Sequence, residues 1–309
     1  MPNIAANQPI ITPAVSNLLL STNFASTTAM GSFATAFVFT GTDSETGFVW
    51  PDNDSDQEGP MKIYYGNLLH AYNSPPETIT SGNFSTYYGA EIQTVTGPDA
   101  TSEKALYIEV KSQNAAHASQ IDLQFQRIIT GTNTAATGDL EHLYTSYYFK
   151  RPASVLAAMS VGNSLAQLDF KTGGYDNLFG GDFRIIQELY KGSDNLLHIR
   201  TRGDRLANGT MTQDPNGILP FSATSTDSYF SKYWQETNRS VVVPVDEWVK
   251  LETYIYRHQK NGIVLSAIND QIVCAHVGRT MGEFGNYWGR LFPALCYGNV
   301  APNPQWVCR

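Results

Sequence analysis

The sequence predicts an all-β protein, a two-sheet antiparallel β-sandwich, and three observations support this fold class. Charged residues make up only 16% of the chain, below the typical value of about 25%. Tyrosine (17), phenylalanine (15) and glycine (25) are abundant, which suits strands joined by turns. Apolar and polar residues alternate in short segments, and no segment longer than about ten residues shows the 3.6-residue period of a helix.

The predicted strands become regular from Lys104 onward. The dipeptides Asn261-Gly262 and Asn269-Asp270 each predict a hairpin turn. Alternation predicts strands at residues 104–110, 120–128, 143–150, 165–171, 183–190, 196–202 and 247–257. Short strands at this spacing are typical of a sandwich or a barrel.

The N-terminal part of the chain is less regular than the rest. The sequence of residues 1–16 predicts an extended, proline-containing arm without the apolar pattern of a core strand. We expect one domain over residues 17–309, with an insertion at about 51–100 that begins with the acidic loop 51–60. A buried strand is predicted at residues 33–39.

Charge and hydropathy exclude several classes of partner. The net charge of −8 is spread thinly and no basic stripe occurs, which argues against a nucleic-acid partner. No run of 18 apolar residues is present, so no membrane span is predicted. The N-terminus shows no secretory signal. Either a signal has been removed or the protein reaches its destination in another way, for instance as part of a virus particle, so we expect an extracellular or particle-surface location.

Residues 165–177, reading LAQLDFKTGGYDN, are the most informative stretch. In a strand, Leu168 and Phe170 would share one face, and Gln167, Asp169 and Lys171 the other. The strand then runs into a glycine turn that carries Tyr175. A row of hydrogen-bonding groups ending in an aromatic ring predicts contact with a sugar. The competing interpretation is a solvent-facing strand on which Asp169 and Lys171 pair locally.

The order of the strands resembles the concanavalin A-like β-jelly-roll superfamily, in its polysaccharide-lyase and glycan-binding branch. The segments that carry the resemblance are 17–24, 48–50, 104–109, 143–152, 165–174, 244–252 and 263–273. The family usually adds a final strand after a segment such as Gln305–Cys308. The resemblance therefore implies an open C-terminal edge, through which, or through the N-terminal arm, the protein could form a homo-oligomer.

Residues 170–177 are similar to the Phe-Lys-Ala-Gly-x-Tyr-x-Gln motif of jelly-roll alginate lyases. This resemblance implies that Tyr175 is the catalytic acid and base and that Lys171 contacts the substrate. The family's Gln-Ile-His motif is not matched, because Asp122 stands at the histidine position of 120–122. A lyase also needs a group that neutralises the uronate carboxylate, and His198 and Arg200 complete the candidate catalytic set.

The concave face of such a sheet collects alternate residues of neighbouring strands. The residues expected to share this face and bind substrate are Gln124, Gln126, Tyr148, Gln167, Asp169, Arg184 and Glu188. A glycosidase is a weaker alternative, because it needs two facing carboxylates and only Asp169 and Glu188 offer such a pair. As a lone histidine, His198 could also have a purely structural role.

Three further expectations concern metals, cysteines and assembly. Asp52, Asp54 and Asp56 have the opening spacing of a calcium loop, so a structural calcium is an alternative to a solvated acidic loop; no cofactor is required. Among Cys274, Cys296 and Cys308, a bridge between the first two is one option and buried thiols are the other. The alternative to an enzyme or glycan binder is a structural or assembly protein that uses the same sandwich as its scaffold.

Overall fold

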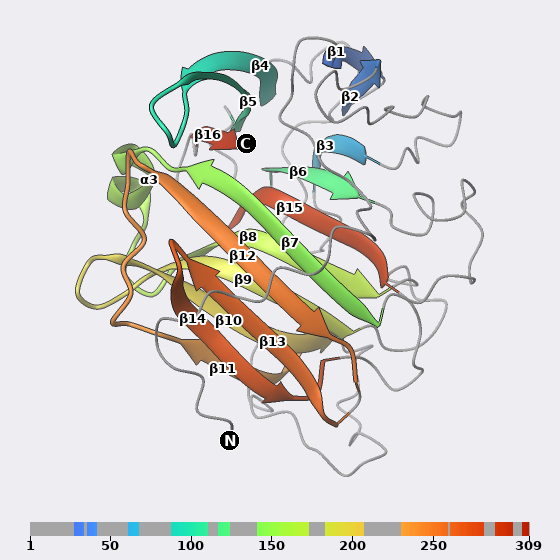
Figure 1. Cartoon of the computed structure of the whole chain (residues 1–309), viewed down its shortest axis with the longest axis vertical. Helices are drawn as coiled ribbons and strands as arrows, with labels where there is room; N and C mark the ends of the chain where they lie inside the picture. Colours follow the sequence, from blue (N-terminus) through green and yellow to red (C-terminus); the bar gives the residue numbers. More distant parts are fainter. Residues whose placement is uncertain are drawn as a thin grey trace.

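The computed structural model describes residues 28–33, 36–41, 61–67, 88–110, 117–123, 141–172, 183–206, 230–258, 260–280, 288–298 and 305–308. These residues form two stacked β-sheets (Figure 1). Every pairing between described strands is antiparallel. The predicted fold class, an all-β two-sheet antiparallel sandwich, is confirmed.

The two sheets differ in size. The nine-stranded sheet has the order β1 (Thr28–Phe33), β2 (Ala36–Gly41), β3 (Met61–Asn67), β6 (His117–Leu123), β15 (Trp288–Gly298), β8 (Ser164–Thr172), β9 (Phe183–Lys191), β10 (Leu197–Leu206) and β11 (Phe230–Thr237). The seven-stranded sheet has the order β14 (Gln271–Gly278), β13 (Gly262–Ile268), β12 (Trp248–Tyr256), β7 (His142–Lys150), β16 (Gln305–Cys308), β5 (Ser102–Val110) and β4 (Tyr88–Thr96). The short helix α3 (Ala153–Ala158) connects β7 to β8.

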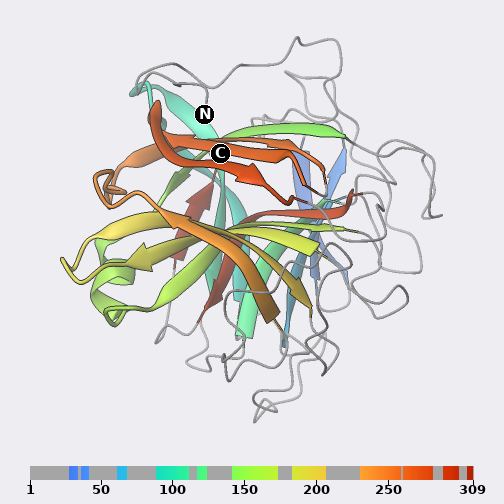
Figure 2. The same cartoon turned by 90° about the horizontal axis from the view of Figure 1, so that it is seen from below.

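The core lies between the two sheets, which Figure 2 shows edge-on. Leu165, Leu189 and Ile199 of the nine-stranded sheet pack in one buried cluster with Phe149 and Leu251 of the seven-stranded sheet. Full burial of one such side chain contributes about 1.5–3 kcal/mol. Because side chains alternate along a strand, the neighbours of these residues on β9 and β10 occupy the opposite face, the outer face of the nine-stranded sheet.

A polar cluster crosses the core between the sheets. Gln187 of β9 donates from Nε2 to Ser266 Oγ of β13 at 2.5 Å and accepts from Thr253 Oγ1 of β12 at 3.0 Å. All three side chains are fully buried. Since buried polar groups are costly unless they are paired, this cluster fixes the relative position of the two sheets.

Two turns follow from their sequence. Asn269 and Asp270 both have positive φ, 44° and 63°, the pair of left-handed residues that a tight hairpin turn requires. They join β13 to β14, as predicted, while the connection from β12 to β13 ends at Asn261 and Gly262 is the first residue of β13.

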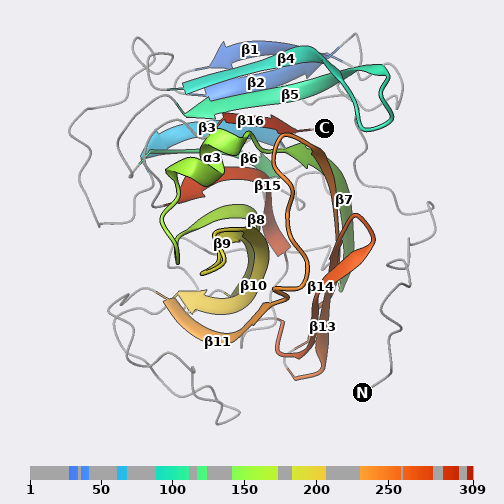
Figure 3. The same cartoon turned by 90° about the vertical axis from the view of Figure 1, so that its left-hand side faces the viewer.

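β11 and β14 are the last strands of their sheets on the same side of the sandwich (Figure 3). Trp234 of β11 donates from Nε1 to the Arg279 carbonyl at 2.7 Å, just beyond β14. Glu236 accepts the Ala275 N–H at 3.1 Å. These contacts occupy backbone groups that an edge strand would otherwise leave unpaired.

Cys274 is a buried, free thiol on β14, so the bridge to Cys296 that the sequence allowed is not formed. Burial raises the pKa of the Cys274 thiol. The alternative expectation, an inert buried thiol, therefore holds for this residue.

The C-terminal segment and the predicted insertion both contribute strands to the sheets. β16 lies between β7 and β5 inside the seven-stranded sheet, so Gln305–Cys308 is not itself the edge of that sheet. β3 and β4 fall within the predicted insertion and pair with β2, β6 and β5. Of the predicted strand 120–128, residues 124–128 lie outside the described residues, and so does the arm 1–16.

We predict that Gln187→Leu lowers the free energy of unfolding by about 1–3 kcal/mol, because it leaves the Ser266 and Thr253 hydroxyls without their amide partner. Urea denaturation followed by circular dichroism measures this. The triple variant Gln187→Leu, Ser266→Ala, Thr253→Val removes every partner and should recover most of the loss. A triple variant no more stable than the single one would show that the cluster is not stabilised by its mutual hydrogen bonds.

Candidate functional site

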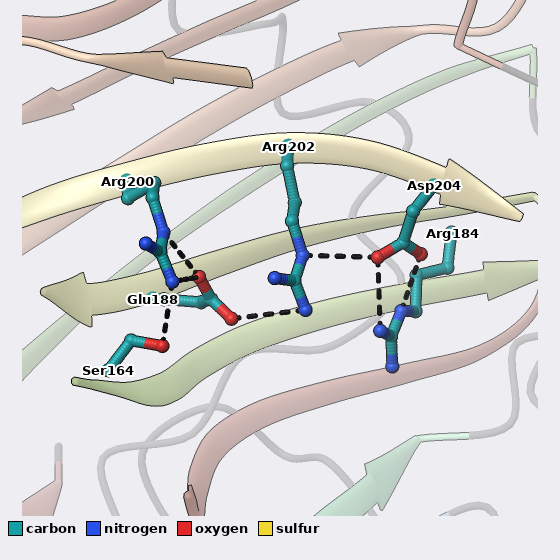
Figure 4. Close-up of polar contacts among 6 residues, drawn as sticks. All are labelled: Ser164, Arg184, Glu188, Arg200, Arg202 and Asp204. Atoms are coloured by element: carbon teal, nitrogen blue, oxygen red, sulfur yellow. Dashed lines mark hydrogen bonds and ion pairs between the residues drawn. The ribbon is translucent and has the colours of Figure 1, made fainter. Parts of the chain in front are cut away.

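Six polar side chains form one connected set on the outer face of the nine-stranded sheet (Figure 4). They come from β8, β9 and β10, and we call them the arginine row: Ser164, Arg184, Glu188, Arg200, Arg202 and Asp204.

Strand alternation and cross-strand register place these charges together. On β9 the outward positions include Arg184 and Glu188, and on β10 they include Arg200, Arg202 and Asp204. The register sets Arg200 directly opposite Glu188 and Asp204 opposite Arg184. Opposite charges facing one another across an antiparallel pair stabilise a sheet.

Glu188 lies between two guanidinium groups. Arg200 donates from Nε to Glu188 Oε2 at 2.7 Å, and its Nη2 lies 2.6 Å from the same oxygen. Arg202 Nη2 lies 3.1 Å from Glu188 Oε1. Arg200 also donates to Ser164 Oγ at 2.8 Å and stacks over the ring of Tyr190 at 4.6 Å. The orientation of Arg200 is thus fixed on three sides.

Asp204 holds the other end of the row. Arg184 donates to both of its carboxylate oxygens, from Nε at 2.7 Å and from Nη2 at 3.0 Å. This two-bond geometry is the strongest form of arginine–carboxylate pair. Arg202 Nε lies 3.0 Å from Asp204 Oδ2, so Arg202 bridges the two carboxylates and joins the halves of the row.

The electrostatics of the row favour the charged form of Glu188. Burial alone raises the pKa of Glu188, but the charges of Arg202, Arg200 and Arg184 and the hydrogen bond from Arg200 outweigh it. The pKa of Glu188 therefore lies below its ordinary range. Three arginines and two carboxylates, 3 − 2, leave one excess positive charge in the row.

Two members of the row, Arg200 and Arg202, are placed to bind an external anion. Arg200 and Arg202 each keep 14% of the side chain exposed, against 5% for Arg184. Their Nη1 atoms make no hydrogen bond or ion pair with any residue that the structure describes. A guanidinium edge of this kind suits a carboxylate or a sulfate.

The structure brings together three of the predicted site residues: Arg184, Glu188 and Arg200. The candidate list omitted Arg202 and Asp204, although both continue the same alternation along β10. Their position two and four residues after Arg200 was the available signal, because residues at this spacing share a face.

Gln167 and Tyr148 are not on this face. A β-bulge between Ala166 and Leu168 in the pairing with β9 breaks the predicted alternation, and a bulge redirects side chains in this way. Gln167 is fully buried, donating to Tyr147 Oη at 3.1 Å. Tyr148 belongs to β7 of the seven-stranded sheet, opposite Lys250.

His198 shares the strand of Arg200 but is fully buried. Its Nδ1 lies 2.9 Å from the Val241 carbonyl, and its Nε2 lies 3.0 Å from Asp194 Oδ2. The pKa of Asp194 lies below its ordinary value, because the Leu196 N–H and then His198 bond to its carboxylate. Both ring nitrogens are occupied, so the geometry fits the structural alternative for His198 and does not place it against a substrate.

The other predicted residues are placed only in part. The backbone register sets Lys171 opposite Arg184 and Asp169 opposite Ile186, on the strand next to the row. Outside the described residues lie Tyr175, Gln124, Gln126, Asp52, Asp54 and Asp56. Within the described part of the chain, no group of three or more histidine, cysteine, aspartate or glutamate side chains could hold a metal ion. No helix in that part is long and apolar enough to cross a membrane.

Comparison with solved structures gives only weak likenesses, with TM-scores below 0.5. No protein-family model and no curated protein matches the chain. Alginate lyase Aly36B is similar over 80% of this chain and 96% of its own, at 12% identity and a TM-score of 0.39. A mutant of that lyase, solved with an alginate trisaccharide, is 13% identical with a TM-score of 0.38. Alginate lyase vAL-1 from Chlorella virus covers 71% of this chain and 86% of its own, at 9% identity and 0.42. Scores this low carry no argument about activity.

We predict that Glu188→Gln lowers the free energy of unfolding at neutral pH by about 2–4 kcal/mol, since it leaves two partly buried arginines short of a partner. The folded pKa of Glu188 is depressed. Its stabilisation is therefore complete above the unfolded value of about 4.3 and is lost as the pH falls through the folded value. Urea denaturation across this pH range should show that the difference in free energy of unfolding between wild type and variant becomes smaller in acid. A gap independent of pH would contradict the prediction.

Proposed function

We propose that this protein binds an anionic polysaccharide on the outer face of β9 and β10. The observation that carries the proposal is the arginine row, where one excess positive charge is held, partly exposed, in a chain of net charge −8. Uronic-acid and sulfated polymers present repeated anions of the type that guanidinium groups bind best.

The fixed orientation of the guanidinium groups supports this proposal. A free arginine loses considerable side-chain entropy when it binds. Glu188 and Ser164 already hold Arg200, and Glu188 and Asp204 already hold Arg202. A binding surface that is ordered in advance loses less free energy on association.

The finer proposal is that the bound polymer is a polyuronate and is cleaved by β-elimination. In this scheme a guanidinium neutralises the uronate carboxylate, which acidifies the proton at C5. Tyr175 acts as acid and base and Lys171 contacts the sugar, as the motif at residues 170–177 implies. The position of Lys171 in register with Arg184 supports this assignment.

The remaining expectations stay predictions. No cofactor is required for binding or elimination, and a structural calcium at Asp52, Asp54 and Asp56 is proposed as a separate feature. An extracellular or particle-surface location is proposed from the nature of the ligand. A structural or assembly role, with contacts through the arm 1–16, stays the alternative.

We predict that wild-type protein binds polyguluronate, polymannuronate or polygalacturonate in calorimetric titration and does not bind neutral dextran. Arg202→Gln should weaken the binding at least about 10-fold, because it removes a charge-assisted contact, while Glu188 and Asp204 keep their other arginines. Lys104→Gln is the matched control: it removes one positive charge from β5 of the other sheet, where Lys104 bonds to Thr94. Equal effects of both substitutions would contradict a site at the row.

We predict that any polymer bound in this way is cleaved with a rise in ultraviolet absorbance from unsaturated uronates. Tyr175→Phe should abolish this rise while leaving polymer affinity within a few-fold of wild type, because it removes the proton-transferring hydroxyl. Binding without a rise in absorbance, in wild type as in the variant, would remove the lyase proposal and leave the binding proposal standing.

A further inference from the structure

Glu188 occupies the centre of the arginine row without being open to a ligand. Its side chain is only 6% exposed, and it contacts Arg200 and Arg202, the two most exposed arginine side chains of the row. A polymer on this face would therefore meet the arginines and not Glu188. Any effect of Glu188 on binding must act through these two neighbours.

Glu188 presents to the arginines the same chemical group as a uronate. Its two oxygens are contacted by three guanidinium nitrogens: Nε and Nη2 of Arg200 and Nη2 of Arg202. Its negative charge also reduces the charge of the row from two positive units to one. Both effects weaken the attraction for an external carboxylate.

From this geometry we infer that Glu188 is a built-in competitor of the polysaccharide: a positioning residue that orients Arg200 and Arg202 while lowering their affinity for an anionic polymer. The inference rests on the proposed function and adds to it how the affinity of the site is set.

Asp204 does not share this role. It is fully buried and is bound through both oxygens to Arg184, which is itself nearly buried. Removing Asp204 would take away the carboxylate partner of the Arg184 guanidinium at a place that no polymer can reach. Because the pKa of Glu188 is below its ordinary range, the competing charge is present in neutral and mildly acidic solution.

A competitor and a purely structural residue predict opposite results for affinity. If Glu188 only supports the fold, Glu188→Gln lowers both stability and binding. If it competes, the same substitution lowers stability and strengthens binding. Glu252 supplies a matched control on β12 of the seven-stranded sheet. It is 4% exposed, pairs with Lys250 Nζ at 3.0 Å and accepts a hydrogen bond from Tyr144, so Glu252→Gln makes the same change of charge at a similarly buried carboxylate.

The experiment is calorimetric titration of polyuronate into wild type, Glu188→Gln, Glu252→Gln and Glu188→Asp, with folding checked by circular dichroism. Glu188→Gln should bind about 2- to 5-fold more tightly at low salt, the effect of one added, partly exposed charge contact. The gain should shrink with salt. Glu252→Gln should lose stability without this gain, and Glu188→Asp, which keeps the charge, should bind no more tightly than wild type.

A second comparison keeps the inference testable if the single variant Glu188→Gln folds poorly. In the Arg202→Gln background only Arg200 loses its carboxylate when Glu188→Gln is added. Arg202→Gln alone reduces the excess positive charge of the row from one to zero. Adding Glu188→Gln restores it to one, so binding should recover toward the wild-type level.

The outcomes separate the two proposals. Absence of polymer binding by wild type and by Glu188→Gln overturns the proposed function and this inference together. Binding by wild type, with unchanged or weaker binding after Glu188→Gln in both backgrounds, overturns the inference alone. An equal gain in Glu252→Gln also overturns it, because net charge would then explain the effect.

Discussion

The register between β9 and β10 is the constraint on which the site depends. It sets Arg200 opposite Glu188 and Asp204 opposite Arg184, and Arg202 spans the diagonal between the two carboxylates. A slip of one residue in either strand would turn the charged side chains of that strand into the core. Burial of unpaired charge is so costly that the ion pairs and the register enforce each other.

The same alternation ties the site to the core. On β9, Leu189 and Gln187 point toward the other sheet while Arg184 and Glu188 point away. Gln187 is locked to Thr253 and Ser266 across the sandwich. The backbone that carries the arginines is therefore held from behind by a buried hydrogen-bond cluster as well as by apolar packing, and this is the rigid support that an ordered binding surface needs.

Under the proposed function, the arginine row serves both stability and binding. Glu188 holds the guanidinium groups in place and, as the inferred competitor of the ligand, occupies part of their binding capacity. A site of this kind trades affinity against order, the conflict that functional sites commonly show. The histidine on the same strand takes no part in it, since His198 is committed to the Val241 carbonyl and to Asp194.

The sequence by itself determined the β class, six regular strands, part of a seventh at residues 120–123 and two hairpins, because side-chain alternation and turn chemistry are local properties. It also indicated Arg184, Glu188 and Arg200 as neighbours, since each lies at the outward parity of an unbroken strand. Tertiary structure decided the rest. The bulge beside Gln167 depends on how β8 pairs with β9. Tyr148 is separated from the arginine row because β7 belongs to the other sheet. The interior position of β16 depends on its pairing with strands far away in the chain. Such long-range pairing is set by the packing of the two sheets, which a local pattern does not contain.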